Sequence, residues 1–217
     1  MKIFVLFFII IFISLSYSQI ADKTNYYFVF LRSNPDKEKL CEVKVNALQE
    51  AHMKNIEDLH KAGKLVAAGP FDGGGGIFIL KSGSIEESTS DFMSDPAIKA
   101  NRFRVDIHPV KFYKGKICPV GEEYEMVTYK FIEFIPQSQL SNCCAQELNS
   151  VLEKYAEEGN TIASLYFSDA GGGVVISDRN NEDEFKNELD KIEFIAEGKV
   201  NYTIRNLWIA KETFCEE

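Results

Sequence analysis

The chain has 217 residues, of which 45% are hydrophobic and 26% are charged, and its formal net charge is −9. This composition is typical of a globular protein and excludes a disordered chain, a collagen-like repeat and a disulfide-dense miniprotein. The acidic balance argues against a nucleic acid as partner, because phosphates attract a basic surface. It also argues against electrostatic attachment to a membrane surface.

The first 18 residues have the pattern of a secretory signal peptide. Lys2 precedes an apolar run over residues 3–13, and Ser16 and Ser18 stand just before a cleavage point at Gln19. An uncleaved membrane anchor is the alternative, but the apolar run is shorter than the ~20 residues that cross a bilayer. We therefore expect an exported protein, secreted or periplasmic, that has no membrane partner after cleavage. Loss of Lys2 would change its net charge to −10.

Strand and helix signals alternate along the next 95 or so residues, the size of a small domain. Aromatic and β-branched residues predict a strand over residues 26–32, which Asn34-Pro35-Asp36 ends. Apolar side chains at helical spacing then predict a helix that stops at Gly63, with the stripe Val45, Leu48, His52, Ile56 and Leu59. The remaining predicted elements are strands at 65–68 and 77–80 around the turn of residues 73–76, a helix from Ser84 to near Asp95-Pro96, and a strand at 102–112. Pro109 in the last strand suggests an edge or a bulge.

The same order of signals recurs in the second half of the chain. Gly63 matches Gly159 and Phe71 matches Phe167, both at an offset of 96 residues. The predicted elements are strands at 125–134, 161–167, 174–177 and 200–210, with helices at 139–158 and 182–189. Trp208, the only Trp, alternates within the last strand and is expected in the core.

These patterns predict an α+β fold built from two ferredoxin-like β-α-β-β-α-β units. A unit of ~95 residues leaves much of its surface exposed when it stands alone. We therefore expect the two units to pack sheet to sheet as an intrachain pseudo-dimer, with no prediction of a higher oligomer. The predicted division is a signal peptide at 1–18, a first unit at 19–114, a linker at 115–123 and a degenerate second unit at 124–217.

The first unit resembles a YCII-related domain of the dimeric α+β barrel superfamily. The residues that carry the resemblance are the strand 27–32, the helix residue His52, the segment 64–70 that ends in Gly69-Pro70, the glycine-rich hairpin and Asp95-Pro96. The match covers roughly residues 25–113. The resemblance implies small domains that pair their sheets as dimers, with the second repeat here replacing the partner.

The resemblance also implies a His–Asp pair, which maps to His52 and Asp72. A neutral imidazole held by a carboxylate is a competent general base. The alternative is a buried histidine that is hydrogen-bonded and has no chemical role. The second repeat does not keep this His–Asp pair, because Leu148 stands at the position that corresponds to His52.

Three further side chains are candidate ligand-binding residues: Arg32, Asp95 and His108. Arg32 ends the first strand and could receive an anion, although a surface ion pair is the alternative. Asp95 belongs to the Asp-Pro motif, and His108 precedes Pro109 on a strand that could line a cleft between the sheets. Residues 73–76 lack the Gly-Lys-Ser/Thr ending of a phosphate-binding loop, so a hairpin turn is favoured.

The five cysteines have neither a CxxC motif nor a nearby histidine, so no metal site is expected. They are Cys41, Cys118, Cys143, Cys144 and Cys215. In an oxidising compartment they can pair, and the odd number leaves at least one without an intrachain partner. Cys118 and Cys215 lie in segments that a disulfide would tie down, but the sequence does not assign partners.

Two functions of different classes remain open. The first is a small-molecule enzyme of the isomerase or lyase kind that uses His52 as base and Asp72 to orient it. The second is a non-catalytic module of the same fold that binds a small ligand. No cofactor motif is present, and the sequence names no substrate.

Overall fold

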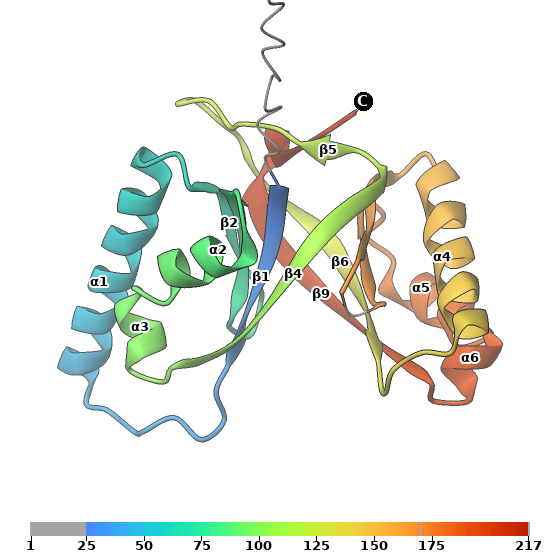
Figure 1. Cartoon of the computed structure of the whole chain (residues 1–217), viewed down its shortest axis with the longest axis horizontal. Helices are drawn as coiled ribbons and strands as arrows, with labels where there is room; N and C mark the ends of the chain where they lie inside the picture. Colours follow the sequence, from blue (N-terminus) through green and yellow to red (C-terminus); the bar gives the residue numbers. More distant parts are fainter. Residues whose placement is uncertain (1–24, 170, 217) are drawn as a thin grey trace, which may run out of the picture.

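The computed structural model describes residues 25–169 and 171–216. The predicted signal peptide lies outside these residues. The described chain has an α+β fold with a large antiparallel sheet, and Figure 1 shows helices α1–α3 on one side of it and α4–α6 on the other. Within the described ranges, we find no helix with the length and apolar character needed to cross a bilayer.

The first half of the described chain contains four long strands and three helices. They are β1 (Asn25–Ser33), α1 (Glu42–Lys61), β2 (Leu65–Pro70), β3 (Gly76–Ser82), α2 (Ile85–Phe92), α3 (Pro96–Lys99) and β4 (Phe103–Lys114). The predicted order is confirmed apart from α3, an additional short helix, and most boundaries agree within about two residues. The helix α1 ends two residues before Gly63, whose positive φ of 70° lets the chain turn into β2.

The second half repeats this order of long elements. They are β6 (Met126–Pro136), α4 (Asn142–Glu157), β7 (Thr161–Phe167), β8 (Gly173–Ser177), α5 (Glu182–Leu189), α6 (Glu193–Ala196) and β9 (Val200–Ala210). Two short strands, β5 (Lys116–Ile117) and β10 (Phe214–Cys215), pair with each other. The predicted linker at 115–123 therefore contains a strand, and a disulfide between Cys118 and Cys215 joins the same two segments.

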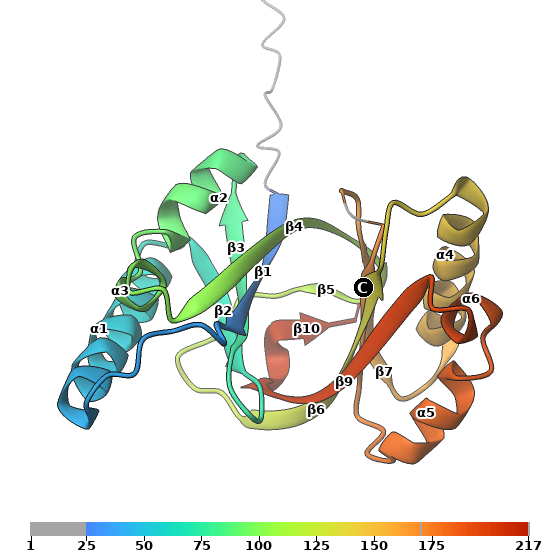
Figure 2. The same cartoon turned by 90° about the horizontal axis from the view of Figure 1, so that it is seen from below.

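The eight long strands form one sheet in the order β2-β3-β1-β4-β7-β8-β6-β9. Strand β4 joins the two halves, because it pairs with β1 as far as Pro109 and with β7 from Val110 onward. Pro109 thus lies where β4 changes partner, which explains its tolerance inside a long strand. At the other end of the order, β2 meets β9 through an isolated bridge between Phe71 and Leu207, so the sheet curls back on itself (Figure 2).

Three apolar clusters hold this arrangement together. The inner cluster lies on the concave side of the sheet and combines residues of both halves, among them Phe28, Phe30, Phe131 and Phe167. The two outer clusters lie under the helices of the first and of the second half. Alternation along β1 explains the division, because Phe28 and Phe30 belong to the inner cluster while Tyr27, Val29 and Leu31 face the helices.

Two burial predictions are wrong. Trp208 is 50% exposed, because it alternates away from the inner cluster, which Leu207 and Ile209 enter. Val45 is 39% exposed, because the first turns of α1 run beyond the part of the helix that packs on the sheet, where Ile56 and Leu59 lie. Both exposed side chains belong to elements whose apolar pattern extends past the available packing partner.

Candidate functional site

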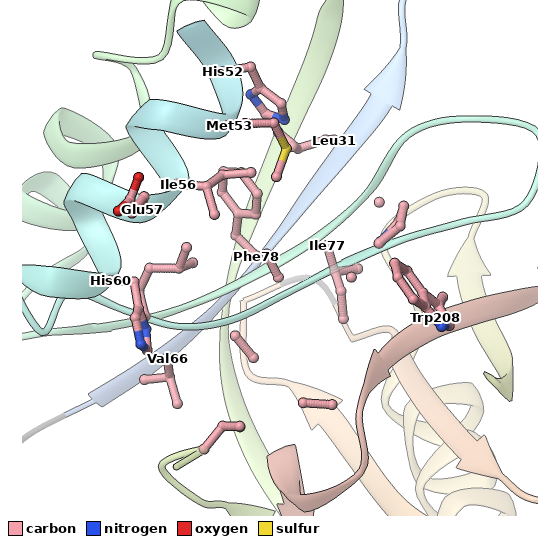
Figure 3. A pocket seen from close by; sticks show the side chains of 18 of the residues that line it. Leu31, His52, Met53, Ile56, Glu57, His60, Val66, Ile77, Phe78 and Trp208 are labelled. Atoms are coloured by element: carbon pink, nitrogen blue, oxygen red, sulfur yellow. The ribbon is translucent and has the colours of Figure 1, made fainter. Parts of the chain in front are cut away.

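A cavity of about 940 Å³ lies between α1, the hairpin β2–β3 and the strand β9. Its wall is mainly apolar, and Figure 3 shows these side chains around the open space. They include Leu31, Met53, Ile56, Val66, Ile77, Phe78 and Trp208. The volume falls within the range of small-molecule sites, which are also mostly apolar with few polar groups.

His52 is the most buried polar residue in this wall, with 8% of its surface exposed. Its ring stacks on Phe78 at 5.9 Å between centroids and lies 5.8 Å from Phe103. Its Nδ1 atom lies 2.7 Å from Oδ2 of Asp95. His52, a member of the apolar stripe that the sequence predicts for α1, therefore faces the sheet.

Asp95, whose carboxylate bonds the His52 ring, is fully buried. Its Oδ1 accepts hydrogen bonds from the backbone N–H groups of Ala97 and Ile98, at 2.8 and 3.3 Å, and so caps α3. Its Oδ2 accepts a second hydrogen bond from Asn55 Nδ2 at 3.1 Å. The carboxylate is therefore fixed by four donors, and this fixes the orientation of His52.

The ring of His52 has one nitrogen left for a ligand. A carboxylate accepts hydrogen bonds, so Nδ1 is the protonated nitrogen of the His52 ring and donates its hydrogen bond to Asp95. In the neutral ring Nε2 then has a free lone pair. Among the described residues, no side chain or backbone group bonds to Nε2 of His52, which belongs to a residue of the cavity wall.

His60, two turns further along α1, lines the same cavity. Its Nδ1 atom lies 3.1 Å from the carbonyl oxygen of Leu65, where β2 begins. His60 lies off the apolar stripe that the sequence predicts for α1. The residue is exposed, but the hydrogen bond to β2 turns its ring toward the cavity (Figure 3).

The predicted contact between His52 and Asp72 is wrong, since the carboxylate at His52 is that of Asp95. Asp72 is exposed beyond the end of β2, and its Oδ2 accepts a hydrogen bond from Asn206 Nδ2 at 2.7 Å. Its backbone N–H donates to the carbonyl of Asn206 at 3.2 Å, so it fastens β9 beside β2. Asp72 does not belong to the cavity wall.

Arg32 belongs to a cluster of charges between the two halves, which we call the Arg32 cluster: Arg32, Asp106, Glu133 and Arg205. Arg32 bonds Asp106 and Glu133, each at 2.5 Å, and Arg205 bonds Glu133 at 2.8 Å. Burial acts to lower the pKa of Arg32, but the two carboxylates outweigh it and the pKa rises above its ordinary value. Burial lowers the pKa of Arg205. The predicted anion contact of Arg32 is thus taken by side chains of the protein itself.

His108 lies on the concave side of the sheet rather than in the cavity wall. Its ring stacks on Phe167 at 4.6 Å, and Nδ1 lies 3.2 Å from Asp169 Oδ1. Neither His108 nor the Arg32 cluster lines the cavity at α1. In the part of the chain that the structure describes, no group of three or more His, Cys, Asp or Glu side chains is placed to hold a metal ion.

Comparison with known proteins gives distant structural similarity. No family model matches the chain, and no curated protein matches it significantly. A candidate monooxygenase from Lactobacillus acidophilus NCFM has a TM-score of 0.45 and 11% identity over 89% of this chain and 99% of its own. One from Fusobacterium nucleatum has a TM-score of 0.44 and 9% identity, over 89% and 97%.

A third solved structure, an anthrone oxidase-like protein, has a TM-score of 0.44 and 8% identity, over 86% of this chain and 90% of its own. Similarity at this level does not carry an activity from those proteins to this chain. The resemblance to YCII-related domains stays a prediction. The function proposed below therefore rests on the cavity and the residues in its wall.

Proposed function

We propose that this protein binds a largely apolar small molecule in the cavity at α1 and that His52 exchanges a proton with it. One observation carries the proposal: a histidine in an apolar cavity wall has its Nδ1 atom 2.7 Å from a buried carboxylate. A general base needs a defined tautomer and hydrogen-bond reach to its substrate. Asp95 fixes the tautomer of His52, and the position of His52 in the cavity wall supports hydrogen-bond reach to a bound substrate.

The chemistry that fits is removal of a proton from a carbon next to a carbonyl group. The C–H bond would break, its electron pair would remain on the substrate as an enolate, and Nε2 of His52 would take the proton. The resulting imidazolium would lie beside the carboxylate of Asp95, which stabilises the positive charge. Return of the proton at another carbon gives an isomerisation, and loss of a leaving group gives an elimination.

The alternative function is ligand binding without chemistry, and the apolar wall supports it equally. Trp208 provides a direct measurement, because it is the only Trp of the chain and lies in the cavity wall. Binding of 2-decanone should change the Trp208 fluorescence. In D₂O, His52 should also speed exchange of the α-hydrogens of 2-decanone, measured by NMR.

The matched variants are His52→Gln and His108→Gln, because His108 lies outside the cavity wall. Exchange should be lost in the first and retained in the second. Binding without exchange would reject proton transfer and leave the binding function, whereas no fluorescence change with 2-decanone or 1-decanol would overturn the proposal as a whole.

We further propose that the two halves are degenerate copies of one unit and serve as a pseudo-dimer within the chain. Equivalent contacts support this: Phe71 of the first half bridges Leu207 of the second, and Phe167 of the second half pairs with Val110 of the first. A cationic or aromatic side chain covers each phenylalanine, with Arg205 3.7 Å above Phe71 and His108 stacked on Phe167. The second half would then be structural, because Leu148 in α4 takes the place of His52.

Export to an oxidising compartment is also part of the proposal. Disulfides persist in secreted and periplasmic proteins and are rare in the cytosol. The pair Cys118–Cys215 links segments 97 residues apart in sequence, where it fastens the short strands β5 and β10. Amino-terminal sequencing of the exported protein tests this, because the mature chain should begin at Gln19.

A further inference from the structure

Two imidazoles from one helix line the cavity, and each has its Nδ1 atom engaged. His52 is held by the Asp95 carboxylate at 2.7 Å, and His60 by the carbonyl oxygen of Leu65 at 3.1 Å. Both partners only accept hydrogen bonds, so Nδ1 is the protonated nitrogen in each neutral ring. Each Nε2 atom is then left as an acceptor for a proton-donating group of a ligand.

The two acceptors are separated by apolar wall. His52 and His60 are eight residues apart in α1, which corresponds to about 12 Å along the helix axis. Ile56 lies between them on the helix, and Val66 and Phe78 line the cavity on the facing strands (Figure 3). A ligand in contact with both histidines would therefore place an apolar body against these side chains.

Two of the three charged residues that line this cavity, Lys54 and Glu57, are in ion pairs, and the third, Glu50, is exposed. Lys54 pairs with Asp58 at 2.5 Å, and Glu57 pairs with Lys61, in both cases one turn apart on the exposed side of α1. These ion pairs leave the two histidines as the polar groups best placed to orient a ligand. A neutral or weakly acidic ligand suits them better than a multiply charged one.

We propose that the cavity takes an elongated molecule with an apolar body and a proton-donating group at each end, one bound by His52 and the other by His60. The proposal deepens the proposed function and rests on it, since both concern the same cavity. It names His60 as a specificity-determining residue, which selects molecules with two polar ends over those with one.

The test uses 1,10-decanediol and 1-decanol as probes with the full exported chain. Binding is followed through the fluorescence of Trp208. The diol should bind about five- to tenfold more tightly than the alcohol, as expected for one additional hydrogen bond in an apolar site. His60→Gln should remove most of that advantage, whereas His108→Gln should keep it.

A second measurement does not depend on a variant. In ¹⁵N-histidine-labelled protein, which has 3 His, the diol should shift the Nε2 resonances of both His52 and His60 in one complex and leave that of His108 in place. Equal affinity for diol and alcohol, with no shift at His60, would overturn this inference while leaving the proposed function intact. If neither probe binds, the proposed function fails as well.

Discussion

The Nδ1 atom of His52 and the Oδ2 atom of Asp95 lie 2.7 Å apart although 43 residues separate them in the chain. The contact joins α1 to the start of α3, and the same carboxylate caps α3 through the N–H groups of Ala97 and Ile98. One buried side chain therefore has two tasks. It stabilises the fold locally, and it holds the imidazole at the cavity.

Replacing Asp95 should thus reduce both stability and the integrity of the site. Asp95→Ala leaves two backbone donors, Asn55 and His52 without their acceptor, and we expect a loss of about 3 kcal/mol in the free energy of unfolding. Asp95→Asn keeps a capping oxygen and should cost less. Urea denaturation measures both variants, with the exposed Asp58→Ala as control. Equal stability of Asp95→Ala and wild type would contradict this assignment.

The charge cluster around Glu133 should be a second point of sensitivity. The Glu133 side chain is 4% exposed and bonds Arg32 and Arg205, so its removal leaves Arg205 without a counter-ion beside Arg32, which keeps only Asp106. We expect Glu133→Ala to destabilise the protein by about 3–5 kcal/mol. The control is Glu125→Ala, which removes an exposed ion pair with Lys211 and should change stability by less than about 1 kcal/mol. A similar small effect at both positions would show that the cluster is dispensable.

The long elements could be predicted from sequence because their apolar periodicity is set by burial in the fold. Strand β1 alternates between the inner cluster and the helices, and α1 ends near a glycine with positive φ. The partner of His52 could not be predicted in this way. Asp95-Pro96 reads as a helix stop, whereas the structure uses Asp95 as the cap of a new four-residue helix that begins at Pro96.

The residues that form the cavity wall could not be predicted from the sequence either. Alternation places Trp208 on a face of β9, but it does not say whether another element covers that face. The hydrogen bond from His60 to Leu65 depends on the turn between α1 and β2, which brings the end of the helix back over the strand. A helical stripe reports only the side of α1 that packs on the sheet, so it excludes His60.

The acid sensitivity of the second half should depend in part on Glu188. Its carboxylate receives two hydrogen bonds from Arg179, both at 3.0 Å, and these hold the pKa of Glu188 below its ordinary value. A depressed folded-state pKa adds stability above the unfolded-state pKa, and this stability is lost as the pH falls through the folded-state value. The difference in stability between wild type and Glu188→Gln should therefore shrink as the pH falls.

At neutral pH this difference should be below about 1 kcal/mol, because the Glu188 carboxylate is partly exposed and solvent screens the pair. Chemical denaturation over a pH series measures it. Glu184→Gln, an exposed substitution on the same helix α5, is the control and should not show the same pH-dependent difference. A constant difference at every pH would exclude the Arg179–Glu188 pair as its source.

Thiol counting tests the pairing of cysteines. With Cys118 and Cys215 joined, three free thiols remain: Cys41 and Cys143 are exposed and Cys144 is buried. We expect two fast-reacting thiols in the native protein and a third on unfolding. Cys118→Ala with Cys215→Ala should lower stability by up to about 4 kcal/mol, because the closed loop is long. If five thiols reacted once the protein was unfolded, the pairing of Cys118 with Cys215 would be contradicted.

Gly69 lies where β2 passes closest to β9, beside the cavity. A Cβ atom there would stand 2.8 Å from Leu207 Cδ1 and 2.9 Å from the Trp208 carbonyl oxygen. The leucine can rotate, but the backbone carbonyl cannot move without shifting β9, so Gly69→Ala should cost about 1–3 kcal/mol of stability. Because the same shift moves Trp208, its fluorescence should change in the folded variant. Gly159→Ala is the matched control, since its Cβ would meet nothing within 4 Å, and it should leave both stability and fluorescence close to wild type. If the two variants behave alike, β2 and β9 are not in close contact in solution and the cavity wall at Trp208 is not formed by their approach.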